Sequence, residues 1–183
     1  MSSLIEKYNW TDELEPFCIT IAVGAELALV ETAFKIIPET RKLTTAAEYS
    51  DFAGDMSEGN DVVQINTLSN SVVVIENNGW TGCDLDHSII KSIGCPVFVS
   101  VFRNINSVMQ FTYAKNGVLV RQFDPLLYDA EGAIPEEASY SWNLEHPIVS
   151  AFALAETLTG IEMTRAWLLD QAHPTYRTRH GNG

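Results

Sequence analysis

The segment from Val97 to Phe123 constrains the fold more than any other part of the chain. It contains three runs rich in β-branched and aromatic residues, Val97–Phe102, Val108–Ala114 and Val118–Phe123. Asn116-Gly117 separates the last two runs, and this dipeptide is favoured in a two-residue type I′ hairpin because both residues tolerate positive φ. The segment therefore predicts a three-stranded antiparallel meander.

A hairpin and one further strand are predicted upstream of the meander. Asp61–Thr67 alternates apolar and polar residues, whereas Ser71–Glu76 is apolar on both faces and is expected near the centre of a sheet. Leu68-Ser69-Asn70 between them has a length that suits a hairpin. Phe17–Val23 has the β-branched composition of another strand. Together these runs predict an α+β fold with a mainly antiparallel sheet of five to six strands packed against helices.

Helical spacing of apolar residues is clearest in two segments. Ala25–Ile37 has apolar residues at three- and four-residue steps and ends before Pro38, so a helix is expected there. A single helix over residues 11–37 is the alternative, and Gly24 argues against it. Pro147–Leu158 predicts a second long helix, with Pro in the first turn and Gly160 after the end. Shorter helices are expected from Thr44 or Thr45 to Phe52 with Glu48 in a capping box, over His87–Ser92 with Asp84 or Asp86 as the cap, and over Thr164–Gln171.

The length of 183 residues suits one compact domain. We assign it to residues 1–172 and expect residues 173–183 to form a flexible basic tail. No apolar run approaches the roughly 20 residues needed to span a bilayer, so a membrane protein is not expected. The N-terminus has neither the basic start nor the apolar stretch of a secretory signal, so a cytoplasmic location is expected.

The net charge of −13 is the main compositional outlier. A surface of this sign repels phosphate backbones, so direct nucleic-acid binding is disfavoured. The acids are clustered: five lie between Glu48 and Asp61, and eight lie between Gln122 and Thr164, with no Lys or Arg in either segment. Such clusters indicate either simple solubility or an acidic face that binds a basic protein.

Known catalytic and metal-binding motifs are missing from the sequence. There is no dinucleotide, P-loop, metalloprotease, hydrolase or EF-hand pattern, so no catalytic, cofactor-binding or metal-binding residue is predicted and an enzyme is not favoured. Cys18, Cys83 and Cys95 form an odd set without zinc-site spacing and are expected to be reduced, small apolar residues. Asp84-Leu85-Asp86-His87 could hold a metal or serve in acid–base chemistry, but helix capping is the favoured interpretation.

A possible binding surface is predicted from polar and aromatic residues in turns and loops. Aromatic side chains with a polar group are common at interfaces, although packing as small satellites of the core is the alternative. The asparagines after Arg103 are either turn residues or the lining of a pocket. The residues of this predicted surface are Glu76, Asn78, Trp80, Arg103, Asn104, Asn106, Tyr128, Tyr140 and Trp142.

Three segments together resemble a family of uncharacterised bacterial proteins from actinomycetes that share a domain of unknown function. The segments are Val74–Gly82 (VIENNGWTG), Val99–Asn106 continuing through Phe111–Ala114 and Gly117 to Phe123–Leu126 (FDPL), and Ala153–Gly160 (ALAETLTG). The resemblance spans residues 15–170 and implies a strand, a glycine and then a helix over Phe17–Ile37. Ala25-Glu26-Leu27 stands where the family has a helix-start proline and a more basic helix. The resemblance implies no activity.

Three functions are compatible with these features. The first is a non-enzymatic protein-binding module, such as an acidic inhibitor, immunity-type or accessory protein that docks a basic partner. The second is a small-molecule-binding protein or unrecognised enzyme with a pocket near Glu76–Trp80 and Arg103–Asn106. The third is a structural subunit of a larger assembly. Charge and loop aromatics favour the first.

Overall fold

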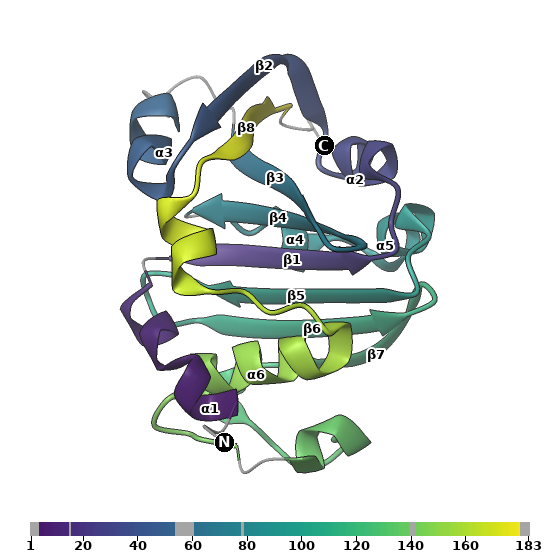
Figure 1. The fold of residues 1–183 in the computed structure, drawn as a ribbon. Coiled ribbons are helices and arrows are strands. Elements are labelled where there is room, and N and C mark those ends of the chain that lie inside the picture. Colours follow the sequence, from purple (N-terminus) through teal and green to yellow (C-terminus); the bar gives the residue numbers. More distant parts are fainter. Residues whose placement is uncertain (1–3, 15, 54–60, 78, 140–141, 180–183) are drawn as a thin grey trace.

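The structure, a computed structural model, describes residues 4–14, 16–53, 61–77, 79–139 and 142–179, apart from the side chains of residues 50, 53 and 139. Its main element is one antiparallel sheet of eight strands in the order β2-β8-β3-β4-β1-β5-β6-β7 (Figure 1). The α+β class is confirmed, but the sheet is larger than the predicted five to six strands and the helices are a minor part. Among the described residues, no helix is long and apolar enough to cross a membrane. The strands are β1 (Phe17–Val23), β2 (Ile36–Thr44), β3 (Val62–Leu68), β4 (Ser71–Asn77), β5 (Val97–Arg103), β6 (Met109–Lys115), β7 (Val118–Phe123) and β8 (His173–Thr178).

The predicted meander and upstream hairpin are confirmed. β5, β6 and β7 pair in sequence order, and Lys115 pairs with Val118 across the Asn116-Gly117 turn. Asn116 has φ 51° and Gly117 has φ 74°, as the type I′ turn requires. β3 and β4 form the second hairpin, and β1 lies between β4 and β5 at the centre of the sheet.

The predicted helix over Ala25–Ile37 is too long. Helix α2 covers only Leu27–Ala33, and the chain then enters β2, an edge strand that contains Pro38. Proline lacks a backbone N–H and is tolerated at a sheet edge, where no ladder bond is needed on the outer side. The proline was therefore misinterpreted as the end of a helix.

The predicted flexible tail is wrong for residues 173–178. These residues form β8, which is inserted between β2 and β3 and is antiparallel to both. Pro174 is tolerated in this inner strand because the β3 ladder covers only Thr175 to Arg177 of β8 and does not include the proline. Residues 180–183 lie outside the described part of the chain.

Helix α6 (Pro147–Thr159) covers one face of the sheet and contacts β5 (Figure 1). Its residues from Pro147 to Ala155 are all buried. The Phe152 ring packs against Tyr8 and Phe17, with both pairs of ring centroids 5.7 Å apart. Such aromatic burial is a large apolar contribution to stability, so this helix anchors the main core.

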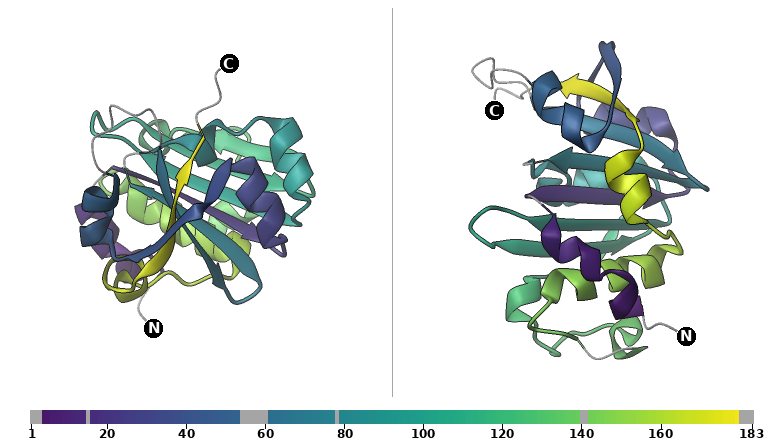
Figure 2. Two further views of the ribbon diagram at one scale, coloured as in Figure 1. Left: turned by 90° about the horizontal axis from the view of Figure 1, so that it is seen from above. Right: turned by 60° about the vertical axis from the view of Figure 1, so that its left-hand side comes forward.

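The opposite face is covered by α2, α4 (Thr81–Asp84) and α5 (His87–Ile93). α2 and α5 enclose a second core between themselves and the sheet. Figure 2 shows the helices distributed on both sides of the twisted sheet. The remaining helical segments are α1 (Leu4–Lys7), η1 (Asn9–Glu13), α3 (Ala46–Ala53), η3 (Pro125–Leu127), η4 (Pro135–Ser139) and the π-helical η5 (Ala166–Asp170).

The predicted helix caps are confirmed. The Asp86 carboxylate accepts a hydrogen bond from the Ile89 N–H at 2.9 Å at the start of α5. Glu48 accepts from the Thr45 N–H at 2.9 Å at the start of α3. Gly94 and Gly160 end α5 and α6 with φ 70° and 68°, a conformation that glycine adopts without a Cβ clash.

Candidate functional site

A row of polar side chains crosses the face of the sheet opposite α6. The strand register brings them together: Cys18 is beside Glu76, Thr20 is beside Ser100, and Thr112 is between Ser100 and Gln122. These side chains occupy a face that is otherwise apolar, since Val72, Val74, Phe98 and Ala114 belong to its core. Most of these polar side chains are buried, whereas that of Gln110 is half-buried and that of Gln122 is exposed. Buried polar groups are costly unless they are hydrogen-bonded, so this row is a candidate site. We call Cys18, Thr20, Glu76, Ser100, Gln110, Thr112 and Gln122 the polar row.

Glu76 is a buried carboxylate at one end of the polar row, with a residue exposure of 1%. Its two oxygens accept hydrogen bonds from the backbone N–H groups of Thr81 and Gly82, each at 2.8 Å. Among the described residues, no Lys or Arg forms an ion pair with it. Burial raises the pKa of Glu76, and the N–H groups of α4 oppose that rise. The carboxylate therefore fixes α4 on the sheet.

Gly82 allows α4 to approach the sheet. A Cβ at this position would lie 2.0 Å from the Thr20 hydroxyl oxygen and 3.2 Å from the Cys18 sulfur. No side chain larger than hydrogen fits without displacement of the helix. The helix is thus held by two complementary features, the Glu76 carboxylate and a glycine contact with β1.

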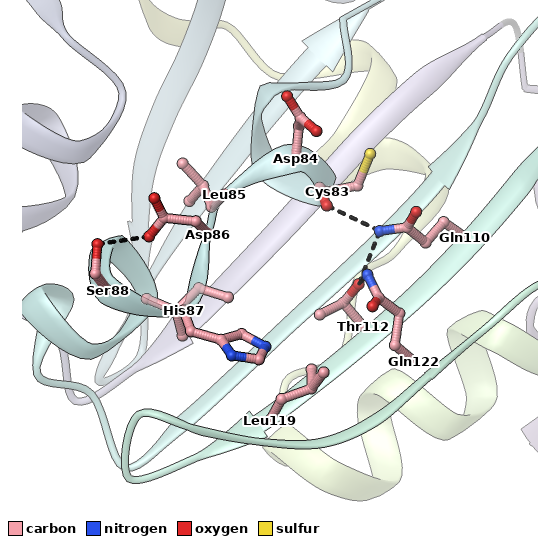
Figure 3. A pocket seen from close by; sticks show the side chains of 11 residues that line it. Cys83, Asp84, Leu85, Asp86, His87, Ser88, Gln110, Thr112, Leu119 and Gln122 are labelled. Atoms are coloured by element: carbon pink, nitrogen blue, oxygen red, sulfur yellow. Dashed lines mark hydrogen bonds between the residues drawn. The ribbon is translucent and has the colours of Figure 1, made fainter.

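An open groove of about 600 Å³ lies beside α4, over β6 and β7 (Figure 3). On its floor, the Gln110 side-chain amide donates to the Cys83 carbonyl at 2.8 Å and to the Thr112 hydroxyl at 3.1 Å. The Gln122 amide also reaches the Thr112 hydroxyl, at 3.4 Å. The groove is lined by Cys83, Asp84, Leu85, Asp86, His87, Ser88, Ile90, Gln110, Thr112, Leu119 and Gln122.

The groove has an acidic rim. Asp84 and Asp86 are exposed there, and His87 and Ser88 lie beside them. Hydrogen bonds from the Ser88 hydroxyl and from the Ile89 N–H, the second of which caps α5, lower the pKa of Asp86. Within the described ranges, neither Lys nor Arg lines the groove. The arrangement can accept hydrogen bonds from a polar or cationic group.

No described group of three or more His, Cys, Asp or Glu side chains is placed to hold a metal ion. Asp84, Asp86 and His87, the candidate metal ligands of the sequence, are therefore not arranged as a metal site. Asp86 acts as the predicted helix cap, and all three side chains also border the groove, which the sequence did not indicate.

The two predicted pocket segments lie at neighbouring strand ends. Phe17 of β1 pairs with Asn77 on one side and with Arg103 on the other. Glu76 is enclosed beneath α4, whereas Arg103 and Asn104 border a separate cavity of about 240 Å³. The segments are therefore brought to one end of the sheet but have different surroundings.

The predicted turn residues have clear structural partners. Arg103 donates to the Asp12 carbonyl at 3.2 Å. The Asn104 side chain accepts from the N–H groups of Asn106 and Val108, both at 2.9 Å, as an Asx turn does. Asn78 lies outside the described residues. Trp80, at the start of α4, has a 62% exposed side chain.

The loop aromatics Tyr128 and Trp142 form a satellite of the core. Their rings stack with centroids 4.5 Å apart and an interplanar angle of 7°. Phe123 packs against both rings, and the Arg121 guanidinium lies 4.4 Å from the Phe123 ring centroid. Tyr140 lies outside the described residues.

The sequence interpretation missed most of the polar row. Thr20, Ser100, Gln110, Thr112 and Gln122 all fall within the predicted strands, but the sequence interpretation gave none of them a functional role. Their recurrence at alternate positions on paired strands was the available signal, because such residues share one face of a sheet. It could not be assembled without the order of the strands.

Comparisons with family models, with curated proteins and with solved structures found no match. The similarity to the actinomycete family therefore stays a prediction, and the functional argument depends on the groove itself.

Proposed function

We propose that this protein is a non-enzymatic protein-binding module that docks a basic segment of a partner in the groove between α4–α5 and β6–β7. The main supporting observation is the lining of the groove. It has exposed carboxylates at the rim, amides and a hydroxyl on the floor, and no basic side chain among the described residues.

The shape and polarity of the groove favour a protein segment over an enclosed small molecule. Sites for small molecules have a similar volume, roughly 300–1,000 Å³, but are mostly apolar and enclose most of the ligand. This groove is open and rich in polar groups (Figure 3). An extended segment can bind there while its backbone stays partly in water.

The chemistry of the groove suits Lys and Arg side chains. Asp84 and Asp86 can accept from their cationic groups, while Leu85 and Leu119 can contact the aliphatic stems. The net charge of −13 would attract a basic partner from a distance and increase the association rate. Exposed ion pairs add little affinity each, so we expect binding that depends on salt.

A photo-crosslinking amino acid in place of Leu119 tests this proposal. Leu119 borders the groove, and Val118, the preceding residue of β7, is exposed but does not border it. We expect Leu119 to crosslink a protein through a Lys- or Arg-rich segment identified by mass spectrometry, and Val118 to give little product. A synthetic peptide of that segment should bind the full chain, and high salt should weaken the binding.

The double variant Asp84→Asn/Asp86→Asn provides the specific control. Asparagine is as good an N-cap as aspartate, so α5 should remain folded. The loss of two rim charges should weaken peptide binding about tenfold. Equal crosslinking at positions 118 and 119, or unchanged affinity in the double variant, would contradict the proposal.

Small-molecule binding is a second candidate, favoured by an apolar cavity on the α6 side of the sheet. The cavity has a volume of about 230 Å³ and is lined by residues that include Phe17, Ile75, Asn77 and Leu168. Asn77 places it next to the region where the sequence predicted a pocket. If the cavity binds apolar molecules, the dye anilinonaphthalene sulfonate should bind the native chain, and Leu169→Trp at the lining should abolish the signal. Equal dye fluorescence in both proteins would exclude this site.

A further inference from the structure

The floor of the groove offers hydrogen-bond acceptors more than donors. Both N–H groups of the Gln110 side-chain amide are used inside the protein, by the Cys83 carbonyl at 2.8 Å and the Thr112 hydroxyl at 3.1 Å. The Cys83 thiol donates to the Trp80 carbonyl at 3.1 Å. A group that binds here must therefore supply hydrogens itself.

The orientation of the Gln110 amide is fixed by this network. A backbone carbonyl can only accept a hydrogen bond, so the Cys83 carbonyl requires the amide nitrogen on its side. The amide oxygen has no hydrogen-bond partner among the described residues and is not buried. The Gln122 amide nitrogen reaches the same Thr112 hydroxyl at 3.4 Å, and its oxygen also has no described partner. The two amides are therefore neighbours, and one ligand group can contact both oxygens.

The rim adds two carboxylates whose oxygens are only partly used. Asp86 Oδ1 accepts from the Ser88 hydroxyl at 2.6 Å and from the Ile89 N–H at 2.9 Å, whereas Oδ2 has no partner within the described ranges. The Asp84 carboxylate has none there either. The groove thus combines neutral acceptors on its floor with negative acceptors at its rim (Figure 3).

We propose that the groove selects arginine over lysine in the segment that it binds. A guanidinium has five N–H donors in one plane and can bond to several acceptors at once, whereas an ammonium is a compact charge with three donors. The guanidinium donates to the floor oxygens of Gln110 and Gln122, and the rim carboxylates balance its charge. This inference rests on the proposed docking function and adds the chemistry that the partner segment must carry.

The floor amides, and not the rim carboxylates, provide the discrimination. Arginine and lysine each carry one positive charge, so an exposed carboxylate attracts both side chains through the same weak, screened interaction. An amide oxygen is neutral and contributes through the number and direction of its hydrogen bonds. Two neighbouring amide oxygens therefore favour the side chain that has several donors in a fixed arrangement.

Peptides of equal charge test this selection on the full chain. One peptide alternates arginine with glycine, and a second has lysine at every arginine position. We expect the arginine peptide to bind about tenfold more tightly in calorimetric titrations at one salt concentration, the effect of one additional charged hydrogen bond. A third peptide with dimethylated arginines keeps the charge but loses N–H donors, and it should bind no more tightly than the lysine peptide.

Variants of the floor test the role of the two amides. We expect Gln110→Met and Gln122→Met to weaken the arginine peptide more than the lysine peptide, so that the ratio of the two affinities falls toward one. Gln171→Met changes an exposed glutamine after η5 that does not line the groove, and it should keep the native ratio. A purely structural role of the floor glutamines would instead weaken both peptides alike, which would overturn the inference.

The outcomes separate this inference from the docking function. If the native chain bound the arginine and lysine peptides equally, and Asp84→Asn/Asp86→Asn weakened both, the groove would dock basic segments without selecting arginine. If none of the peptides bound, the docking function would fail and the selection with it. An unchanged ratio of affinities in both Gln110→Met and Gln122→Met would also overturn the selection by the floor amides.

Discussion

A buried histidine couples the last strand to pH. The His173 ring is enclosed at the start of β8, where its Nδ1 accepts from the Asn66 amide at 2.8 Å and its Nε2–H donates to the Trp167 carbonyl at 2.7 Å. The Asn66 amide oxygen accepts from the Thr67 N–H, which fixes the orientation of the amide. Both ring nitrogens are thus satisfied in the neutral state.

We expect this histidine to destabilise the protein in mild acid. Burial lowers the pKa of His173 below its usual value, so the unfolded chain binds the proton more readily than the folded chain. The free energy of unfolding should therefore fall as the pH drops through about 6.5, by at most about 1.4 kcal/mol per pH unit from this one group, and level off below the folded pKa. The measurement is urea unfolding of the native chain and of the His173→Gln variant over this pH range, which gives the free energy of unfolding of each protein at each pH. Equal slopes for both proteins would contradict this role.

A buried ion pair anchors the segment after β7. The Arg121 Nε lies 3.0 Å from the Glu137 carboxylate, and the guanidinium also donates to the carbonyls of Asp129 and Glu131. Both side chains are almost completely buried. Glu137 is one of the acids that the sequence suggested for an acidic surface, and here its charge is used inside the fold.

Removal of Arg121 from this ion pair should destabilise the protein. We expect Arg121→Ala to lower the free energy of unfolding by about 3–5 kcal/mol, because the Glu137 charge is left buried and two carbonyls lose their donors. The stacked Trp142 should report the local change through its fluorescence. Lys115→Ala on the neighbouring strand, where the side chain is exposed, should have little effect. A loss below about 1 kcal/mol for Arg121→Ala would indicate that this segment is held by the aromatic stack instead.

At the level of elements, the sequence predicted those strands and helices whose signals are local. The meander was found because its runs are β-branched and Asn116-Gly117 specifies the turn. The caps of α3, α5 and α6 were found because each requires a particular residue at the helix end. β2 was missed because it contains Pro38 and several charged residues, which suit a strand only at the edge of a sheet. β8 was missed because its burial depends on pairing with β2 and β3.

The candidate site was less predictable for the same reason. Glu76 was selected as the first residue of the pocket segment Glu76–Trp80, but Cys18, its neighbour across the sheet, is far away in sequence and faces it only through the β1–β4 register. No helix was predicted over Thr81–Asp84, whereas these residues form α4 over the polar row. The chemistry of the row arises from packing across five strands.

Gly82→Ala tests whether α4 closes the polar row. The added methyl cannot fit 2.0 Å from the Thr20 hydroxyl oxygen, so the helix must move outward. We expect a loss of about 1–3 kcal/mol in stability, and faster alkylation of Cys18 and Cys83 by iodoacetamide. Asp84→Ala, at the exposed end of the same helix, is the matched control. Unchanged thiol reactivity in Gly82→Ala would show that α4 does not depend on this contact.

At the scale of the whole molecule, the C-terminal strand completes the sheet. β8 pairs with β2 on one side and β3 on the other, so the chain closes one half of the sheet only when its last segment is in place. His173, Thr175 and Tyr176 are buried there. The Thr175 hydroxyl is also in a hydrogen bond with that of Thr44 on β2, at 2.6 Å.

Truncation distinguishes a structural strand from a dispensable tail. A chain ending at residue 172 loses β8, which leaves β2 without its partner and exposes the edge of β3, so we expect no cooperative thermal unfolding and aggregation through the open edge. A chain ending at Arg179 keeps β8 and should unfold with the native midpoint. Circular dichroism and size-exclusion chromatography of the two proteins provide the measurement. If the shorter chain were monomeric and equally stable, β8 would be an accessory to the fold, and the buried His173 could not account for any acid sensitivity of the protein.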